Sequence, residues 1–230
     1  MVLAALGGLW PEKAVGSAGG GGGILLRGSG GGGRKPWVLL ELLDTALGAT
    51  STADGISLIH GTLGMGQFRP GPIEIHETEF PLRVTRFEVW TDSGGPGRFR
   101  GGLGSLREYE VLEDVSVPVD AAKGARRGLA PPWGVAGGKA ARPGNVAVNG
   151  VPVPERAIEV ILKPGDRLTV TMNGGGGYGD PFERDPENVL GDWVDGYVSL
   201  EAARTEYGVA IDPASRAIDE AATAALRAGR

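Results

Sequence analysis

The stretch PLRVTRFEVWTDSGGPGRFRGGLGSLREYEVL, residues 81–112, decides the fold class. Apolar and polar side chains alternate approximately from Leu82 to Val89, with the period of two that a half-buried β-strand shows. A glycine-rich turn cluster follows at residues 92–97, and the segment from Gly104 to Leu112 predicts a second strand. Two strands joined through a turn indicate antiparallel β structure.

The antiparallel pattern continues toward the C-terminus. Residues 145–148 form a short apolar run, and the Asn149-Gly150 pair that follows favours a hairpin turn of type I′. Residues 158–162 and 167–172 flank Lys163-Pro164-Gly165-Asp166, which is typical of a type II turn. We therefore expect an α+β protein whose mainly antiparallel β body, a sandwich or an open barrel, carries a helical C-terminal tail.

Helical signals dominate the last fifty residues. Asp185-Pro186 is typical of an N-cap followed by proline at the first helical position. Ser199 begins a second helix, which ends before Gly208. Asp212-Pro213 repeats the first signal and predicts a third helix that runs to about Arg227. The tail is expected to pack on the β body through an apolar stripe of Ala217, Ile218, Ala221 and Ala225.

Three regions follow from these patterns. We expect a Gly-rich N-terminal region at residues 1–79, a β-rich domain at residues 80–180 and the helical tail at residues 181–230. Within the first region, the apolar run from Trp37 to Leu43 fits either a buried strand or a turn of helix.

Composition narrows the class of protein. The net charge of −5, with both signs dispersed, argues against nucleic acid and anionic membranes as partners. The chain has no cysteine, which excludes disulfides and thiolate metal sites and fits a cytoplasmic protein. No apolar run reaches the ~18 residues of a membrane span, and the apolar start of the chain lacks the basic leader of a signal peptide.

Glycine is the unusual component, with 42 residues, and one tract stands out. Gly174, Gly175, Gly176 and Gly177 lie between a predicted strand and Asp180-Pro181. Such a loop can hold phosphate on its backbone N–H groups, but the Gly-Lys-Ser/Thr of a nucleotide-binding loop is missing. We expect instead a structural corner whose glycines adopt positive φ or touch neighbouring backbone, with the Asp180 carboxylate free to cap the turn that follows.

Other candidate site residues are cationic or metal-ligating. Arg100 and Lys139 lie in Gly-rich loops, where they could hold a carboxylate or phosphate, or form surface ion pairs. His60 and His76 are weak metal candidates, because two histidines without cysteine rarely make a closed site. We therefore expect no metal in this chain, and the residues assign no catalytic group.

The order of several motifs resembles that of the hydantoinase B family between residues 70 and 211. The matching blocks are Glu79–Val84, Asp92–Gly104, Pro131–Lys139, Pro164–Asp166, Gly174–Pro181, Arg184–Glu187, Gly196–Ser199, Glu201–Ala203 and Tyr207–Val209. This family includes N-methylhydantoinase B, the matching half of 5-oxoprolinase and the large subunits of acetone and acetophenone carboxylases. Its members are generally more than twice as long, so the resemblance covers their C-terminal part.

The resemblance implies a hydrolase of cyclic amides such as hydantoins or 5-oxoproline. Family members work with a hydantoinase A-type subunit whose ATP site activates a carbonyl or carboxylate oxygen by phosphorylation. ATP and a divalent metal are accordingly expected in the complete hetero-oligomeric complex, with no cofactor bound by this chain. The partners implied are the A-type subunit and the N-terminal hydantoinase B portion, and the isolated chain is expected to be inactive. A carboxylase component and a non-catalytic assembly module remain as alternatives.

Overall fold

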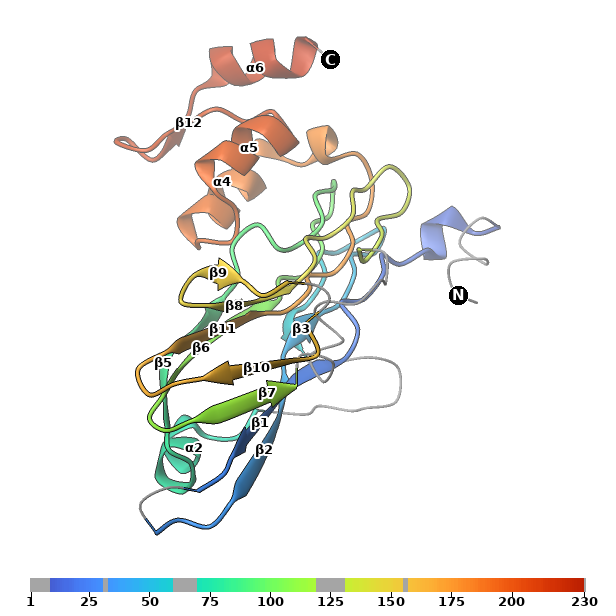
Figure 1. The fold of residues 1–230 in the computed structure, drawn as a ribbon. Helices are drawn as coiled ribbons and strands as arrows, with labels where there is room; N and C mark the ends of the chain where they lie inside the picture. The colour runs from blue at the N-terminus through green and yellow to red at the C-terminus, as the bar shows by residue number, and fades with distance from the viewer. Residues whose placement is uncertain (1–8, 31–32, 60–69, 119–130, 155–156, 230) are drawn as a thin grey trace.

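The computed structural model describes residues 9–30, 33–59, 70–118, 131–154 and 157–229. Two open antiparallel sheets form its body, and a helical tail lies at one end of them (Figure 1). One sheet has the strand order β10-β7-β1-β2, with the bounds Glu159–Leu162, Val115–Pro118, Gly22–Gly28 and Trp37–Leu43. The other has the order β5-β6-β11-β8-β9, with the bounds Leu82–Val89, Ser105–Val111, Arg167–Thr171, Asn145–Val148 and Val151–Pro152.

The two sheets pack face to face as a sandwich, because one buried apolar cluster draws side chains from both. Ile24 and Leu26 of β1 meet Tyr109 of β6 and Val170 of β11 in this core. The prediction of an α+β protein with an antiparallel body is confirmed, and the open-sheet sandwich is the form it takes. Strands β1 and β2 precede residue 80 yet share a sheet with β7 and β10, so the β body extends into the region at residues 1–79.

Trp37–Leu43 is a strand, which settles the ambiguity of that apolar run. Both of its faces are largely apolar: Leu39 and Leu43 point into the core, whereas Val38 and Leu40 are exposed. The apolar run lacks the usual alternation of apolar and polar residues because both faces of this strand are apolar.

The predicted strand that follows residue 80 contains an irregularity. The register of β5 against β6 shifts between Val84 and Arg86. An extra residue in one strand reverses the alternation beyond it, which explains why the apolar positions run Leu82, Val84 and then Phe87, Val89.

Both predicted turns are present. Asn149 and Gly150 have φ values of 50° and 78°, as a type I′ turn requires, and they join β8 to β9. Gly165, with φ of 89°, lies in the turn between β10 and β11. Because those two strands belong to different sheets, this turn carries the chain across the sandwich.

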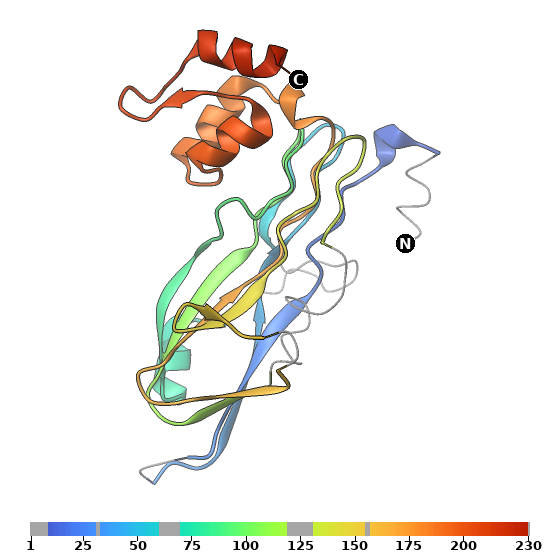
Figure 2. The ribbon, with the colours of Figure 1, turned by 45° about the horizontal axis from the view of Figure 1, so that its top comes forward.

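Shorter elements complete the fold. A two-stranded pair, β3 and β4, precedes helix α2, and the tail contains helices α4 to α6 and the pair β12 and β13 (Figure 2). Their bounds are η1 Pro11–Lys13, β3 Thr45–Ala46, β4 Ser57–Ile59, α2 Ile73–Glu79, η3 Pro181–Glu183, α4 Pro186–Val194, α5 Leu200–Tyr207, β12 Ile211–Asp212, β13 Ala217–Ile218 and α6 Glu220–Ala228.

The first two helices of the tail begin where the sequence predicts. Asp185 caps α4 by accepting a hydrogen bond from the Glu187 N–H, and Ser199 caps α5 by accepting one from Ala202. Gly208 ends α5 in the left-handed conformation. These caps are local interactions, which is why the pattern alone locates them.

The prediction for the third helix is wrong at its start. Asp212 does not begin a helix: its carboxylate accepts hydrogen bonds from the Ala214 N–H and the Ser215 hydroxyl, and so stabilises the turn between β12 and β13. Helix α6 begins later, where Asp219 accepts a hydrogen bond from the Ala222 N–H. Ala217 and Ile218 lie in β13, so the predicted helical stripe does not exist.

Candidate functional site

Extended glycine-rich segments lie between the sheets and the tail, and Gly174–Gly177 pass through their middle. We call residues 16–19, 46–49, 94–97, 100–104, 133–139 and 174–179 the glycine layer. A Cβ atom on any residue of the tract would meet backbone of another segment at 2.2 Å or less. The atoms met are the carbonyl oxygens of Ser93, Leu47, Trp133 and Pro96, at 2.0, 2.0, 1.9 and 2.2 Å from positions 174, 175, 176 and 177.

Successive N–H groups of the tract point to different neighbours. Those of Gly175, Gly176 and Gly177 donate to the carbonyl oxygens of Gly102, Ser17 and Lys139, at 2.9, 2.8 and 3.0 Å. This rotation from one neighbour to the next is what an extended helix with three residues per turn produces. In a flat β-strand, successive groups would alternate between two sides.

The carbonyl groups of the same residues are also engaged. Gly175, Gly176 and Gly177 accept hydrogen bonds from the N–H groups of Gly95, Ala49 and Val135, at 2.8 to 2.9 Å. Since these N–H and C=O groups bond within the protein, the tract is a structural corner rather than a phosphate cradle. Its contact with neighbouring backbone confirms the prediction of close approach.

Asp180 ends the tract in the predicted way. Its carboxylate accepts a hydrogen bond from the Phe182 N–H at 2.9 Å and caps η3. Gly179, just before it, has φ of 73°, a conformation that favours glycine. The helical tail therefore begins directly after the glycine tract.

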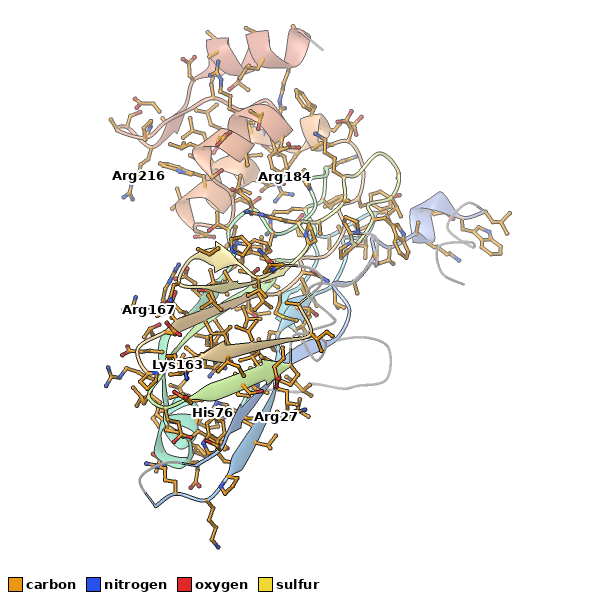
Figure 3. All side chains as sticks on the ribbon, viewed as in Figure 1. Arg27, His76, Lys163, Arg167, Arg184 and Arg216 are labelled. Atoms are coloured by element: carbon orange, nitrogen blue, oxygen red, sulfur yellow. The ribbon has the colours of Figure 1, made fainter. Side chains whose placement is uncertain are left out.

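Four charged residues join the tail to the glycine layer, and we call Asp54, Arg100, Arg184 and Asp192 the ion cluster (Figure 3 labels Arg184). The Arg184 guanidinium binds both carboxylate oxygens of Asp54 at 2.7 and 2.8 Å and reaches Asp192 at 2.8 Å. The Arg100 Nε lies 3.3 Å from Asp192, and its backbone N–H donates to Asp54 at 2.7 Å. Arg100, predicted as an anion-binding candidate, is thus bound to carboxylates of the protein itself.

The charges of the ion cluster stabilise one another. Burial alone would raise the pKa of Asp54, but the hydrogen bonds and charge of Arg184, with a contribution from Arg100, hold that pKa below its usual value. Burial would lower the pKa of Arg184, and Asp54 and Asp192 raise it instead. Tyr207, buried beside the cluster, has a raised pKa because burial disfavours its charged form. Asp54 and Arg184 therefore stay ionised at neutral pH.

Lys139 lies at a cleft of about 360 Å³ between the glycine layer and the tail. Its ammonium group pairs with Glu206 of α5 at 2.6 Å, and both side chains are partly exposed. Arg142, another residue that lines the cleft, stacks over the Trp90 ring at 4.5 Å. The charged residues that line the cleft are Asp92, Arg100, Lys139, Arg142, Glu201 and Glu206. The lining carries charges of both signs, so the cleft selects neither anions nor cations by charge alone.

His76 is buried inside the sandwich, away from the cleft. It belongs to helix α2 and is that helix's buried residue. Its Nδ1 lies 3.4 Å from Glu41, whose other partners are Arg107 at 2.5 Å and the Tyr109 hydroxyl at 2.5 Å. Burial, followed by the charge of Glu41, raises the pKa of Tyr109.

No group of three His, Cys, Asp or Glu side chains suited to a metal ion occurs among the described residues. The metal that the family resemblance implies therefore does not fit this part of the chain. His60, the other candidate, lies outside the described residues.

One family model matches most of the chain. The model of hydantoinase B/oxoprolinase matches residues 1–181, which include both sheets of the sandwich and end at the start of η3. The chain belongs to this family. The match includes the glycine layer, Asp54 and Arg100, and it ends before Arg184 and Asp192.

Individual relatives agree with this assignment. The B-type subunit of a putative D-/L-hydantoinase from Pseudomonas sp. (strain NS671) is 35% identical, over 83% of this chain and 32% of its own length. The acetone carboxylase alpha subunit of Xanthobacter autotrophicus is 28% identical, over 79% of this chain and 28% of its own. The crystal structure of the ATP-dependent caprolactamase from Pseudomonas jessenii superimposes with a TM-score of 0.83 and 32% identity, covering 98% of this chain and 40% of that one.

This hydantoinase B-type chain thus spans about a third of the length of the curated relatives it matches. None of the helices in the described ranges has the length and apolar character needed to cross a membrane.

The sequence patterns missed the ion cluster. Asp54 and Arg184 are 130 positions apart, and neither carries a local signal of its partner. Arg184 does lie in one of the motif blocks, Arg184–Glu187, whereas Asp54 lies in none of them.

Proposed function

We propose that this chain is the C-terminal module of a hydantoinase B-type subunit in an ATP-dependent hydrolase of cyclic amides. The observation that carries the proposal is the structural similarity to the ATP-dependent caprolactamase, which extends over 98% of this chain. The 35% identity to the B-type subunit of a D-/L-hydantoinase supports the same reaction class. A hydantoinase A-type subunit would supply ATP binding, and the rest of the B-type subunit would supply the metal site.

In this proposal, the chain's own residues act by positioning. The glycine layer packs backbone against backbone, so the segments that carry Arg100 and Lys139 are held without intervening side chains. The ion cluster then fixes the tail across that layer. The cleft between them is the place where this module could present a surface to a substrate or to a neighbouring subunit.

A carboxylase component is the second candidate. It is favoured by the 28% identity to the acetone carboxylase alpha subunit over 79% of this chain. Because the identity to the carboxylase subunit is lower, we rank the carboxylase as the second candidate.

Reconstitution tests the proposal. The chain would be co-expressed with a hydantoinase A-type subunit and the remaining part of a hydantoinase B-type subunit, and ATP turnover would be measured with hydantoin, caprolactam, 5-oxoproline, acetone and acetophenone. We expect ATP-dependent ring opening of at least one cyclic amide, and none when this chain is omitted. Bicarbonate-dependent turnover of a ketone alone would support the carboxylase, and equal activity without this chain would contradict the proposal.

The isolated chain provides the first prediction. We expect neither ATP hydrolysis nor ring opening from it, because no Gly-Lys-Ser/Thr loop is present in its sequence and no metal cluster occurs among the described residues. Phosphate release and substrate loss measured on the purified chain would check this. Robust turnover would contradict it.

A further inference from the structure

Strand β2 forms one edge of the four-stranded sheet, and its exposed face is apolar. Val38 is 59% exposed and Leu40 is 64% exposed. Leu40 pairs with Leu25 of β1, which is half-buried on the same face. At the opposite edge of the sheet, Ile161 of β10 is 56% exposed. We call Val38, Leu40, Leu25 and Ile161 the outer patch.

One row of paired residues crosses the whole sheet on this face. Val38 pairs with Arg27, Arg27 with Ser116, and Ser116 with Ile161. Arg27, labelled in Figure 3, is the cation in this row. This row is therefore apolar at the two edges of the sheet and polar at its centre, and the apolar side chains adjoin one another on β2 and β1.

Strand β2 itself carries none of the sequence features that usually protect a free edge against pairing. Edge strands of soluble proteins are normally blunted by proline, by outward-pointing lysines or by bulges. The sequence of β2, WVLLELL, has one charged residue, Glu41, and that side chain points inward to Arg107. Its seven residues pair with β1 without a register shift, and among the described residues no strand pairs with its other edge. An apolar edge of this length is a template for a further strand.

We infer that the outer patch and the free edge of β2 bind the part of a hydantoinase B-type subunit that this sequence does not include. The inference rests on the proposed function and names the surface that the proposed assembly would use. This chain matches about a third of the length of relatives that carry the remaining two thirds in the same subunit. The remaining part contributes a β-strand to the edge of β2 and apolar side chains to the outer patch, whether it lies on the same polypeptide or on another.

The test uses the first two thirds of the B-type subunit of the Pseudomonas sp. hydantoinase as the probe, co-expressed with the tagged 230-residue chain. We expect the probe to co-purify with the wild-type chain and the amides of β2 to exchange hydrogen more slowly in the complex. Leu40→Lys should weaken binding roughly tenfold or more, since it places a charge in the centre of a desolvated contact. Val194→Lys is the matched control, because Val194 is 53% exposed on α4 in the tail and should bind as the wild type does.

Two further measurements decide the outcome. The Leu40→Lys chain should keep the wild-type melting temperature, because the residue lies outside the core. If the Leu40→Lys chain recovered as much probe as the wild-type chain does, the inference would be overturned. Failure of the wild-type chain to recover the probe would also overturn it. Sedimentation of the chain alone should show a monomer. A dimer that Leu40→Lys dissociates would identify a second copy as the occupant and would also overturn it.

Failure of the proposed function is separable from failure of this inference. A complex that depends on Leu40 but opens no ring would leave the surface assignment standing. Ring opening that persists in a complex with Leu40→Lys would reject the surface and retain the function.

Discussion

Gly176 lies where three segments of backbone meet, and a Cβ atom there would be 1.9 Å from the Trp133 carbonyl oxygen. Gly176→Ala should therefore force the segments apart or break the hydrogen bond between Gly176 and Ser17. We expect a loss of at least about 2 kcal/mol of unfolding free energy, which corresponds to a fall of roughly 4–8 °C in Tm. Thermal unfolding followed by circular dichroism would measure it.

Gly191 provides the control for this substitution. It lies inside α4, and nothing is within 4 Å of a Cβ atom built there. Alanine in a helix interior is favoured over glycine by about 0.5–1 kcal/mol, so Gly191→Ala should keep or raise Tm. If Gly176→Ala and Gly191→Ala gave the same Tm, the glycine layer would be a slack linker.

Asp54 links stability to pH through its lowered pKa. Because the folded-state pKa lies below the unfolded value of about 3.9, its stabilising contribution is fully present above that value. The contribution is lost as pH falls through the folded-state pKa, below the ordinary 3.8. Asp54→Asn should cost about 1–3 kcal/mol at pH 7 by leaving buried Arg184 with a single carboxylate partner.

The measurement is urea unfolding of wild type and Asp54→Asn between pH 7 and pH 3. The gap between their unfolding free energies should narrow as pH falls below about 4. Asp195→Asn, an exposed position in the tail, serves as the control and should track the wild type. A gap that is constant over this pH range would rule out the charge of Asp54 as its cause.

At the level of elements, the tail has a small core of its own and a polar boundary with the body. Its apolar cluster consists of Val189, Val198, Ala203, Tyr207 and Val209. The boundary is formed by the ion cluster and by hydrogen bonds such as those from Asp92 N–H to Tyr197 and from Ser199 N–H to Asp92. The tail thus contacts the body mainly through charges rather than through an apolar stripe.

A chain that ends at Arg184 tests this boundary. Removing residues 185–230 takes away Asp192, the nearest carboxylate of Arg100, and uncovers the side chains that the tail buries, so Tm should fall by several degrees. A chain that ends at Asp212 keeps α4, α5 and the whole ion cluster, so it should lose much less. Equal Tm values for the two chains, measured by calorimetry, would show that the ion cluster does not hold the tail in place.

Elements whose signals are local were the ones predictable from sequence. The caps at Asp185 and Ser199 and the Asn149-Gly150 turn depend on residues within a few positions of one another. Helix α2, by contrast, went unpredicted: its seven residues have no side-chain N-cap bond, and it packs on β5. The sequence pattern predicted a helix where the pair β12–β13 lies, because Asp-Pro can begin a turn as well as a helix. The pairing of Ile211 with Ile218 favours the turn, and those residues are seven positions apart.

The candidate site was predictable only in part, for the same reason. The glycine tract is visible in sequence, but the five segments that surround it come from positions between 16 and 139. Periodicity cannot report such contacts. The ion cluster combines four residues from separate segments, and a charged side chain looks alike in sequence whether it is buried or solvated.

For the molecule as a whole, we expect no tightly held divalent metal. Among the described residues no metal-binding group exists, and buried His76 already faces Glu41. Metal analysis of the purified chain after dialysis should find well below one equivalent of zinc or manganese. A full equivalent would contradict the prediction, and the loss of that metal in His60→Ala or His76→Ala would then locate the site.

The glycine layer also sets an order of events during protein synthesis. Gly176 donates its hydrogen bond to Ser17, a residue made 159 positions earlier, so this end of the body cannot close until most of the chain exists. At about 5–20 residues per second, the early segment waits roughly 8–32 s on the ribosome for its partner. During that interval β1 and β2 can pair with each other as a hairpin, but residues 16–19 have no backbone partners from the late segment. Premature termination anywhere before residue 174 would therefore release a product whose glycine layer lacks its central segment.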